Sequence, residues 1–334
     1  MQRHTNRRGY DEDFVDGRHL KLNNLKKKAL RVDLEHKYLY KDSVIPAYPR
    51  PEFHVSHLNH DTNQDGLRGI RSDDGFKSPD KGSLLWWSLV VGPDEITSAE
   101  RRLLETTYPD RTEEQAQMQQ SFLGKFATSQ AFQKTSRLGS YRFTFPLEEV
   151  LQAYSDQFCS GAKPEMRVFK TVLYKKEVMY AVLVHMPGDQ RFSDLPLLPH
   201  NRKSVCAYKD GCYIWRSQAM CSEHRYELVL RPDEQQIEAE EVPWRQYYVW
   251  DNVAIALQVD EQVLTFDSNR LRENLKFCEK AKVITARPYE FENYEVAQTR
   301  VADLWPDNPS PLEKAEAEVE PGKTEQEENL TDSD

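Results

Sequence analysis

Hydrophobic residues follow helical spacing in much of the first half of the chain and strand spacing in the second. In the helical part, Leu151, Tyr154 and Phe158 recur at three- and four-residue intervals and predict one face of a helix. Apolar runs predict strands over 53–55, 83–91, 166–174, 177–185, 205–208, 212–215, 226–230, 247–259 and 263–266. Because helices and strands are largely segregated, we expect an α+β fold with a mostly antiparallel, split β-sheet and flanking helices.

Short-range signals predict where several helices begin and end. Asn63 or Thr62 can cap a helix that stops near Gly75. Capping boxes predict two further helices, one opened by Thr97–Glu100 and one by Thr112–Gln115.

Three expectations concern the second half of the chain. The strands over 247–259 and 263–266 are expected to pair with each other. Residues 232–241 are expected to form a polar, acidic loop, and residues after Asp267 a helix with Leu275 and Cys278 on one face.

Composition predicts one globular region between two charged ends. Residues 1–45 are charged and poor in large aliphatic side chains, so we expect a largely disordered N-terminal arm. Its basic cluster, Lys26–Lys28, could also be a nuclear-localisation signal or a patch for an acidic partner. The globular domain is expected over 46–290, and an acidic disordered tail over 306–334. Ten acids and two lysines give residues 307–334 a charge of −8, out of −10 for the chain.

Several classes of protein are disfavoured by the same composition. No run of about 18 apolar residues is present, so no membrane span or membrane partner is expected. The N-terminus does not resemble a signal peptide, and five cysteines without C-x-x-C spacing favour reduced thiols. A cytoplasmic or nuclear protein is therefore expected. Without its tail the chain is nearly neutral, so nucleic acid is not expected as a partner.

Metal and nucleophile signatures are weak. His57 and His60 have the i, i+3 spacing of metal ligands, but on a strand they point to opposite faces, so no metal site is expected. No Walker motif, dinucleotide fingerprint or Ser-His-Asp arrangement is evident.

Two separated motifs nevertheless resemble a known family. His60-Asp61-Thr62 ends a predicted strand, Ile70 lies ten residues after His60, and Gly75-Phe76 follows. The next strand reads Gly82-Ser-Leu-Leu-Trp-Trp-Ser88, and a later one Arg245-Gln-Tyr-Tyr-Val-Trp-Asp251. This order is similar to the ADP-ribosyltransferase fold of poly-ADP-ribose polymerases and RNA 2′-phosphotransferases. The resemblance covers about 45 residues.

The resemblance implies NAD or ADP-ribose as cofactor. It assigns cofactor-binding positions to His60, Thr62, Trp86 and Ser88, with His60 on the nicotinamide ribose and Trp86 stacking on the ring. Gln246 stands where the family has its catalytic Glu, whose charge stabilises the oxocarbenium-like transition state. Glu240 or Glu241 could replace that acid only if the alignment shifted.

Two departures from the family pattern predict lost chemistry. Gln246 carries no charge, and Asp61 replaces a glycine and would repel the phosphates of the cofactor. We therefore expect a degenerate ADP-ribosyltransferase-like protein that binds a nucleotide or a protein partner. The alternatives are an active mono-ADP-ribosyltransferase, and an interaction protein without a small-molecule site whose charged ends bind the partner. It also stays open that Trp86, Trp87, Trp250 and Tyr248 are simply core side chains.

The whole chain also resembles a group of fish proteins induced by viruses and interferon. Segments such as His60–Ile70, Ser83–Leu89 and Gln246–Ala254 carry this likeness. It implies a function in innate antiviral defence.

Overall fold

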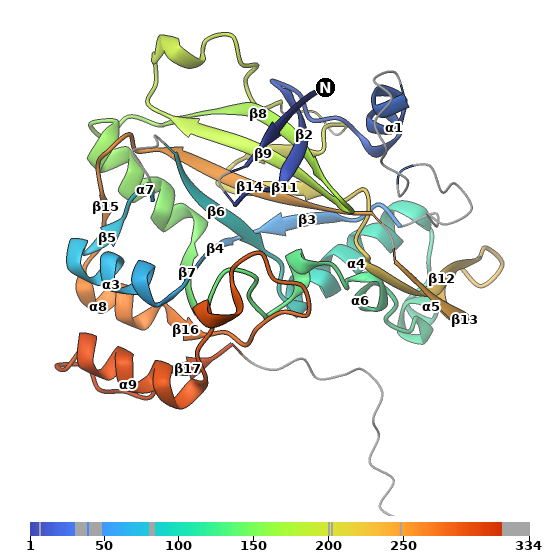
Figure 1. The fold of residues 1–334 in the computed structure, drawn as a ribbon. Coiled ribbons are helices and arrows are strands. Elements are labelled where there is room, and N and C mark those ends of the chain that lie inside the picture. The colour runs from blue at the N-terminus through green and yellow to red at the C-terminus, as the bar shows by residue number, and fades with distance from the viewer. Residues whose placement is uncertain are drawn as a thin grey trace, which may run out of the picture.

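A ten-stranded open sheet forms the centre of the molecule (Figure 1). The computed structural model describes residues 1–6, 8–30, 39, 49–79, 84–199, 201, 203–247 and 249–315. In spatial order the strands are β1 (Gln2–Thr5), β2 (Asp11–Asp16), β8 (Glu165–Tyr174), β9 (Glu177–His185), β14 (Trp250–Gln258), β6 (Leu84–Val90), β4 (His57–Thr62), β7 (Tyr141–Pro146), β16 (Leu275–Phe277) and β17 (Glu313–Lys314). All neighbours are antiparallel except β9–β14 and β16–β17. The expected α+β class with a mostly antiparallel sheet is confirmed.

Three smaller sheets and several helices surround the central sheet. The small sheets are β10 (Cys206–Lys209), β11 (Cys212–Arg216) and β3 (Glu52–Val55); β12 (Glu223–Arg231) and β13 (Gln236–Tyr247); and β15 (Leu264–Thr265) and β5 (Gly75–Phe76). The helices are α1 (Leu22–Leu30), α3 (Gln64–Asp73), α4 (Pro93–Thr107), α5 (Glu113–Met118), α6 (Leu123–Phe126), α7 (Leu147–Phe158), α8 (Ser268–Glu273) and α9 (Tyr294–Leu304). Short 3-10 turns are η2 (Gln130–Phe132), η3 (Gln190–Phe192) and η4 (Pro288–Glu290).

The two faces of the central sheet differ in character. Side chains alternate along a strand, and paired residues share a face. The inner face carries Trp87, Ile255 and Val182, which are paired across β6, β14 and β9 and are at most 1% exposed. The outer face carries Trp86 and Ser88 of β6 together with the small residues of the neighbouring strands. Inner and outer keep these meanings below.

The N-terminal segment departs from the disordered arm expected over residues 1–45. β2 pairs with β8, and β1 extends the sheet by one more strand. Asp13, only 2% exposed, accepts two hydrogen bonds from the Arg3 guanidinium at 3.0 and 3.1 Å. This ion pair lets a charged sequence enter a sheet. Beyond it, α1 buries Leu25 and Ala29. Lys26–Lys28 lie on this helix.

The helix caps predicted from local sequence signals are found more often than the full predicted extents of the helices. Asn63 caps α3, and Thr112 with Gln115 forms the expected capping box of α5. The helix expected from Thr97 begins instead at Pro93, because proline suits a first helical position, and Thr97 bonds back to the carbonyl of Pro93.

The second half differs from expectation at three places. Residues 236–247 form β13, paired with β12, where a loop was expected over 232–241. The helix expected after Asp267 ends at Glu273, and β16 follows it. β14 and β15 do not pair with each other, since β14 lies between β9 and β6 while β15 pairs with β5.

The ordered region extends past the expected boundary at residue 290. α9 and β17 follow it, and Trp305 packs against the core at 3% exposure. The acidic tail beyond residue 315 lies outside the described residues. No helix in the described part of the chain is long and apolar enough to cross a bilayer. All five cysteines are free thiols, as expected.

Candidate functional site

His60 lies on β4, beside β6, as the sequence motif requires. Its Nδ1–H donates to the carbonyl of Trp86 at 3.0 Å. Its ring contacts Phe76 and Trp87, with centroids 5.1 and 5.4 Å apart. Burial lowers the pKa of the imidazole, although the Trp86 carbonyl and Asp61 act in the opposite direction, so the ring is neutral at pH 7. His60 is therefore held among aromatic side chains of the inner face.

Thr62 ends β4 on the same face as His60. It pairs with Tyr141 of β7. A Cβ at Gly66 would lie 1.9 Å from the Thr62 hydroxyl oxygen, so the glycine allows α3 to start directly against the end of β4. This packing explains Gly66 without a ligand.

Asp61 points to the outer face, where Arg142 of β7 neutralises it. The guanidinium donates through Nε and Nη2 to both carboxylate oxygens, at 2.7 and 2.8 Å. Burial disfavours the charged guanidinium, but the Asp61 charge outweighs this and raises the pKa of Arg142. The negative charge of Asp61 is therefore compensated within the ion pair, and its repulsion of cofactor phosphates stays a prediction.

Trp86 and Ser88 lie on the outer face of β6, with Trp86 partly buried and Ser88 exposed. Next to them on β14 are Ala256 and Ala254, paired with Trp86 and Ser88. The small alanine side chains leave room for the indole to lie across the sheet. It reaches Phe169 of β8, two strands beyond β14, with ring centroids 6.2 Å apart.

A β-bulge in β8 completes this outer-face cluster. The register shifts between Val168 and Lys170, so Phe169 and Lys170 both project to the outer face. The Lys170 ammonium lies 5.1 Å from the ring centroid of Phe169, 5.6 Å from Phe14 and 5.8 Å from Trp86. We call Phe14, Trp86, Phe169 and Lys170 the aromatic-lysine cluster.

Lys170 has an unusual environment for a lysine. Burial lowers the pKa of its ammonium, opposed by Glu12 and Asp16, yet neither acid forms an ion pair with it. Among the described residues its nearest partners are ring faces, which attract cations. The group is therefore a positive charge beside an aromatic surface, without a carboxylate of its own.

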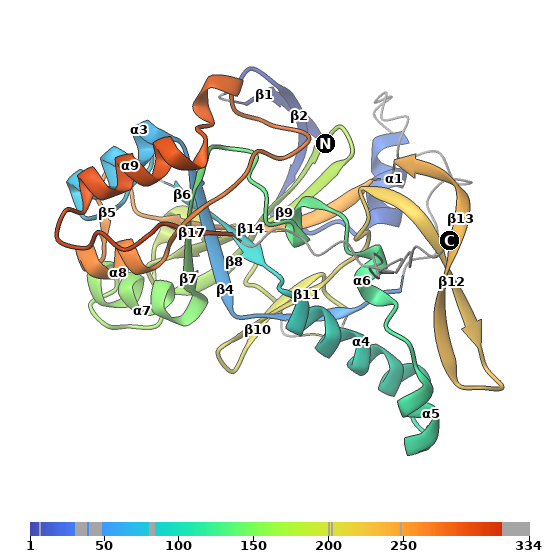
Figure 2. The same ribbon diagram turned by 90° about the horizontal axis from the view of Figure 1, so that it is seen from below.

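Gln246 lies on β13, where its backbone pairs with His224 of β12. β12 and β13 form a separate two-stranded sheet at the opposite side of the molecule from α9 (Figures 1 and 2). Gln246 lies nine residues before Ile255, which pairs with Trp87 in the central sheet. Glu240, on the same strand, is bound to Arg231 at 2.7 Å.

The five predicted site residues thus form three groups. His60 and Thr62 belong to the inner face, Trp86 and Ser88 to the outer face, and Gln246 to a different sheet. The strands of His60 and Trp86 are neighbours, as expected, but their side chains diverge because residues 60 and 86 do not face the same side. Sequence reasoning missed Phe14, Phe169 and Lys170, since a bulge leaves no signal in a single sequence.

Comparison with known proteins adds no relative. The chain matches no protein-family model, no curated protein and no solved structure. The function must therefore be inferred from the geometry of the chain itself.

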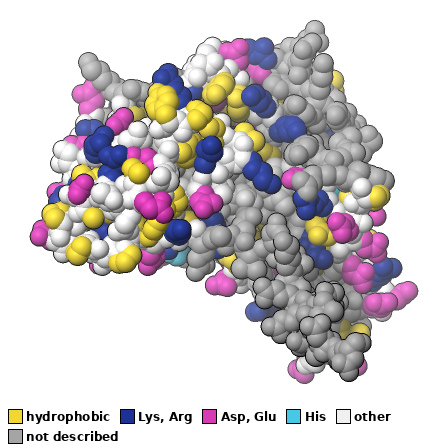
Figure 3. All heavy atoms as spheres, turned by 60° about the horizontal axis from the view of Figure 1, so that its bottom comes forward, with side chains coloured by type: hydrophobic (Ala, Val, Ile, Leu, Met, Phe, Trp, Pro, Cys, Tyr) yellow, Lys and Arg dark blue, Asp and Glu magenta, His cyan; other side chains and the backbone are white. Residues whose placement is uncertain are grey.

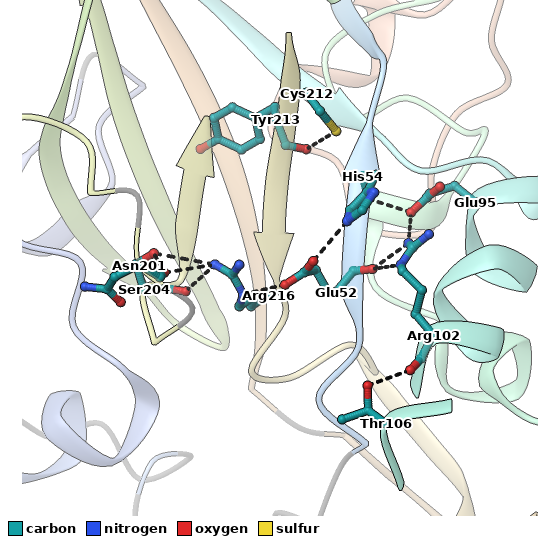
Figure 4. A network of polar contacts seen from close by, with 10 residues as sticks. All are labelled: Glu52, His54, Glu95, Arg102, Thr106, Asn201, Ser204, Cys212, Tyr213 and Arg216. Atoms are coloured by element: carbon teal, nitrogen blue, oxygen red, sulfur yellow. Dashed lines mark hydrogen bonds and ion pairs between the residues drawn. The ribbon is translucent and has the colours of Figure 1, made fainter. Parts of the chain in front are cut away.

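A second polar cluster joins the three-stranded sheet to α4 (Figure 4). Glu52 binds His54 at 2.9 Å and Arg216 at 2.7 Å, while Arg102 bonds the Glu52 carbonyl and pairs with Glu95. These bonds are satisfied within the cluster, so its evident role is to fix β3 against α4.

Nucleophilic or metal chemistry at this second cluster is not supported. Burial and Glu95 raise the pKa of Cys212, which disfavours the reactive thiolate. Across the described residues no group of three or more His, Cys, Asp or Glu side chains is arranged to hold a metal ion.

Proposed function

We propose that this protein is an ADP-ribosyltransferase-like protein without transferase activity, which binds NAD or ADP-ribose on the outer face of its central sheet. The observation that carries the proposal is the aromatic-lysine cluster, with the Lys170 ammonium 5.8 Å from the Trp86 ring centroid. The cluster contains Trp86, the residue that the family resemblance assigns to ring stacking.

The cluster offers the two groups that a nucleotide needs. Partly buried aromatic rings stack on bases or on nicotinamide, at about 1–3 kcal/mol per base. Lys170 lacks a carboxylate partner among the described residues, so its ammonium is available to a phosphate. Ser88 and Asn59 are paired across β6 and β4 on the same face as Trp86. The exposed Ser88 hydroxyl and the Asn59 amide can form hydrogen bonds with ribose hydroxyls.

The strand order also supports the family likeness. β4, which carries the His-x-Thr motif, lies beside β6, which carries the paired tryptophans. β6 lies beside β14, which begins at Trp250 within the last motif. The strands of the first two motifs and the end of the last motif, Trp250-Asp251, are therefore adjacent in the central sheet, whereas Arg245–Tyr247 lie on β13 in another sheet.

Loss of transferase chemistry follows from two features. Gln246 has no charge to stabilise an oxocarbenium-like transition state, and its strand belongs to another sheet. His60 faces away from Trp86 and is held by a main-chain carbonyl. A ligand stacked on Trp86 would therefore not meet the His60 imidazole.

Transferase activity is expected to be absent. Incubation of the protein with labelled NAD should label neither the protein nor added acceptor proteins. Gln246→Glu should not create activity, because charge alone does not bring β13 to the outer face. Labelling by the wild type that is lost in His60→Ala would instead establish an active mono-ADP-ribosyltransferase.

Binding is expected to depend on the aromatic-lysine cluster. In calorimetric titrations with ADP-ribose, Trp86→Ala should weaken binding by about tenfold or more, because it removes the stacking surface. Lys170→Gln should weaken it by about fivefold and reduce its salt dependence. Met118→Ala, at an exposed position on α5, serves as the control and should bind as wild type. Absence of heat with the wild type would overturn the proposal.

The surface charge agrees with a small anionic ligand better than with nucleic acid. On the face shown in Figure 3, basic and acidic side chains are interspersed over the described atoms. We further propose a function in innate antiviral defence and a protein partner, on the strength of the sequence resemblance. Failure of interferon to induce the transcript would count against that role.

A further inference from the structure

A groove of about 770 Å³ lies between α7 and the segment that follows η3. It is formed by α7, the start of β8 and β10, and Figure 2 shows α7 and β10 on the same side of the molecule. Its residue Met166 pairs with Val184 on the inner face of the sheet, whereas the aromatic-lysine cluster lies on the outer face. Its volume is in the range of binding pockets. The lining combines apolar side chains with a few charged groups at the rim.

The apolar part of the groove is partly exposed to solvent. Leu151 of α7 and Leu198 are 7% and 5% exposed, whereas Leu197 is 59% exposed. Met166 of β8 also lines the groove. Burial of the exposed Leu197 side chain by a partner would be favourable, because it removes apolar surface from water.

The backbone beside the groove presents an open strand edge. The N–H of Leu198 donates to the Met166 carbonyl, and the N–H of Val168 donates to the Pro196 carbonyl, both at 2.9 Å. Residues 196–198 therefore pair antiparallel with β8, and the N–H and carbonyl of Leu197 point away from it. An extended peptide can add to such an edge.

Three charged side chains line the rim, and two of them have a partner. Glu149 is paired with Arg270 at 2.7 Å, and the Lys163 ammonium lies over the Tyr208 ring. Glu148 is exposed and forms no ion pair with a described residue. Its carboxylate lies against Gly211, since a Cβ there would be 2.5 Å from Oε1. The free carboxylate favours a basic group in the partner.

We propose that this groove binds an extended segment of a partner protein, with two apolar side chains in the groove and a Lys or Arg beside Glu148. Apolar side chains two residues apart lie on one face of a strand and fit the leucine-lined floor. The segment pairs with the open edge at Leu197. The site is separate from the nucleotide site, and its failure would leave that proposal untouched.

The test is binding of the full chain to an array of ten-residue peptides with an apolar-x-apolar core. Each peptide is present in a version flanked by Lys and in a version flanked by Glu. The wild type should retain the Lys versions about fivefold more tightly, and Glu148→Lys should reverse that preference. N-methylation between the two apolar residues should weaken binding by about fivefold, because a strand-edge hydrogen bond is lost.

Leu197→Glu should abolish retention, whereas Leu230→Glu, at a similarly exposed leucine of β12, should leave it unchanged. Equal retention of Lys and Glu versions, no retention, or a preference unaffected by Glu148→Lys would overturn the proposal. If the wild type bound an apolar dye, Leu197→Glu lost that binding and no peptide was retained, the groove would be assigned to a small molecule. That result would also overturn the proposal.

Discussion

Asp61→Ala is expected to lower the free energy of unfolding by about 3 kcal/mol. The substitution leaves the Arg142 guanidinium, whose side chain is 8% exposed, without its counter-charge. Among the described residues, the carbonyls of Lys134 and Thr135 would remain as its hydrogen-bond partners, at 3.1 and 3.2 Å. Breaking one side of a buried pair is costly because the other charge stays desolvated. Urea unfolding at pH 7 measures the difference.

An exposed ion pair on α3, the helix that follows β4, provides a matched control. Asp65 and Arg68 also form an ion pair, but their side chains are 77% and 54% exposed. Asp65→Ala should therefore change stability by less than about 1 kcal/mol. The double variant Asp61→Ala/Arg142→Met should recover much of the lost stability, since no charge is then buried alone. Equal effects of Asp61→Ala and Asp65→Ala would show that burial of the first pair does not matter.

Asp251→Ala is expected to lower the free energy of unfolding by about 3 kcal/mol at pH 7. The Asp251 side chain is 1% exposed and connects β14 to the loop after β11. It accepts hydrogen bonds from the Ser217 hydroxyl and the Gln218 N–H at 2.8 Å, and from the Ala219 N–H at 3.0 Å. Alanine would leave three donors, two of them buried, without this acceptor.

The effect of Asp251 should depend on pH. Burial raises the pKa of its carboxyl to about 6, although the three donors act to lower it. The folded state therefore holds this proton more tightly than the unfolded state, whose pKa is near the ordinary value of about 3.9. The contribution of Asp251 to stability is largest below pH 4 and falls as the pH rises through 6.

Urea unfolding of wild type and Asp251→Ala from pH 4 to pH 7 tests this sign. The stability difference between them should shrink with rising pH, by on the order of 3 kcal/mol over the whole range. Other titrating groups are common to both proteins and cancel. A constant difference, or one that grows with pH, would contradict a raised pKa.

The sequence predicts local structure well where neighbouring residues decide it. The Asn63 cap of α3 and the Thr112–Gln115 box of α5 depend on side chains within three residues of the bonds they make. The strand over 83–91 is also found, as β6, because its apolar run is continuous.

Long-range pairing explains most of the differences. β2 is strongly charged and becomes a strand because β8, 154 to 160 residues away in sequence, pairs with it. β13 is acidic, yet its Ile237 packs into the core at 2% exposure while its acids face outward. Local composition identifies neither the pairing of β2 with β8 nor that of β13 with β12.

The candidate site was predictable only in part. The sequence places Trp86 and His60 on neighbouring strands, but the facing of each depends on register, and a shift of one residue reverses it. The cluster partner Lys170 depends on the bulge at Phe169. The ion pair of Asp61 depends on Arg142, which β7 brings beside it across 81 residues of sequence.

The central claim is that a nucleotide binds the outer face at Trp86. Nuclear magnetic resonance of the tryptophan indole N–H groups, assigned by single Trp→Phe variants, tests it most directly during titration with ADP-ribose. The account predicts that the Trp86 signal shifts while the signal of Trp87, 1% exposed on the inner face, stays in place. A shift of Trp87 and the His60 imidazole without Trp86, or no shift at all, would contradict the account.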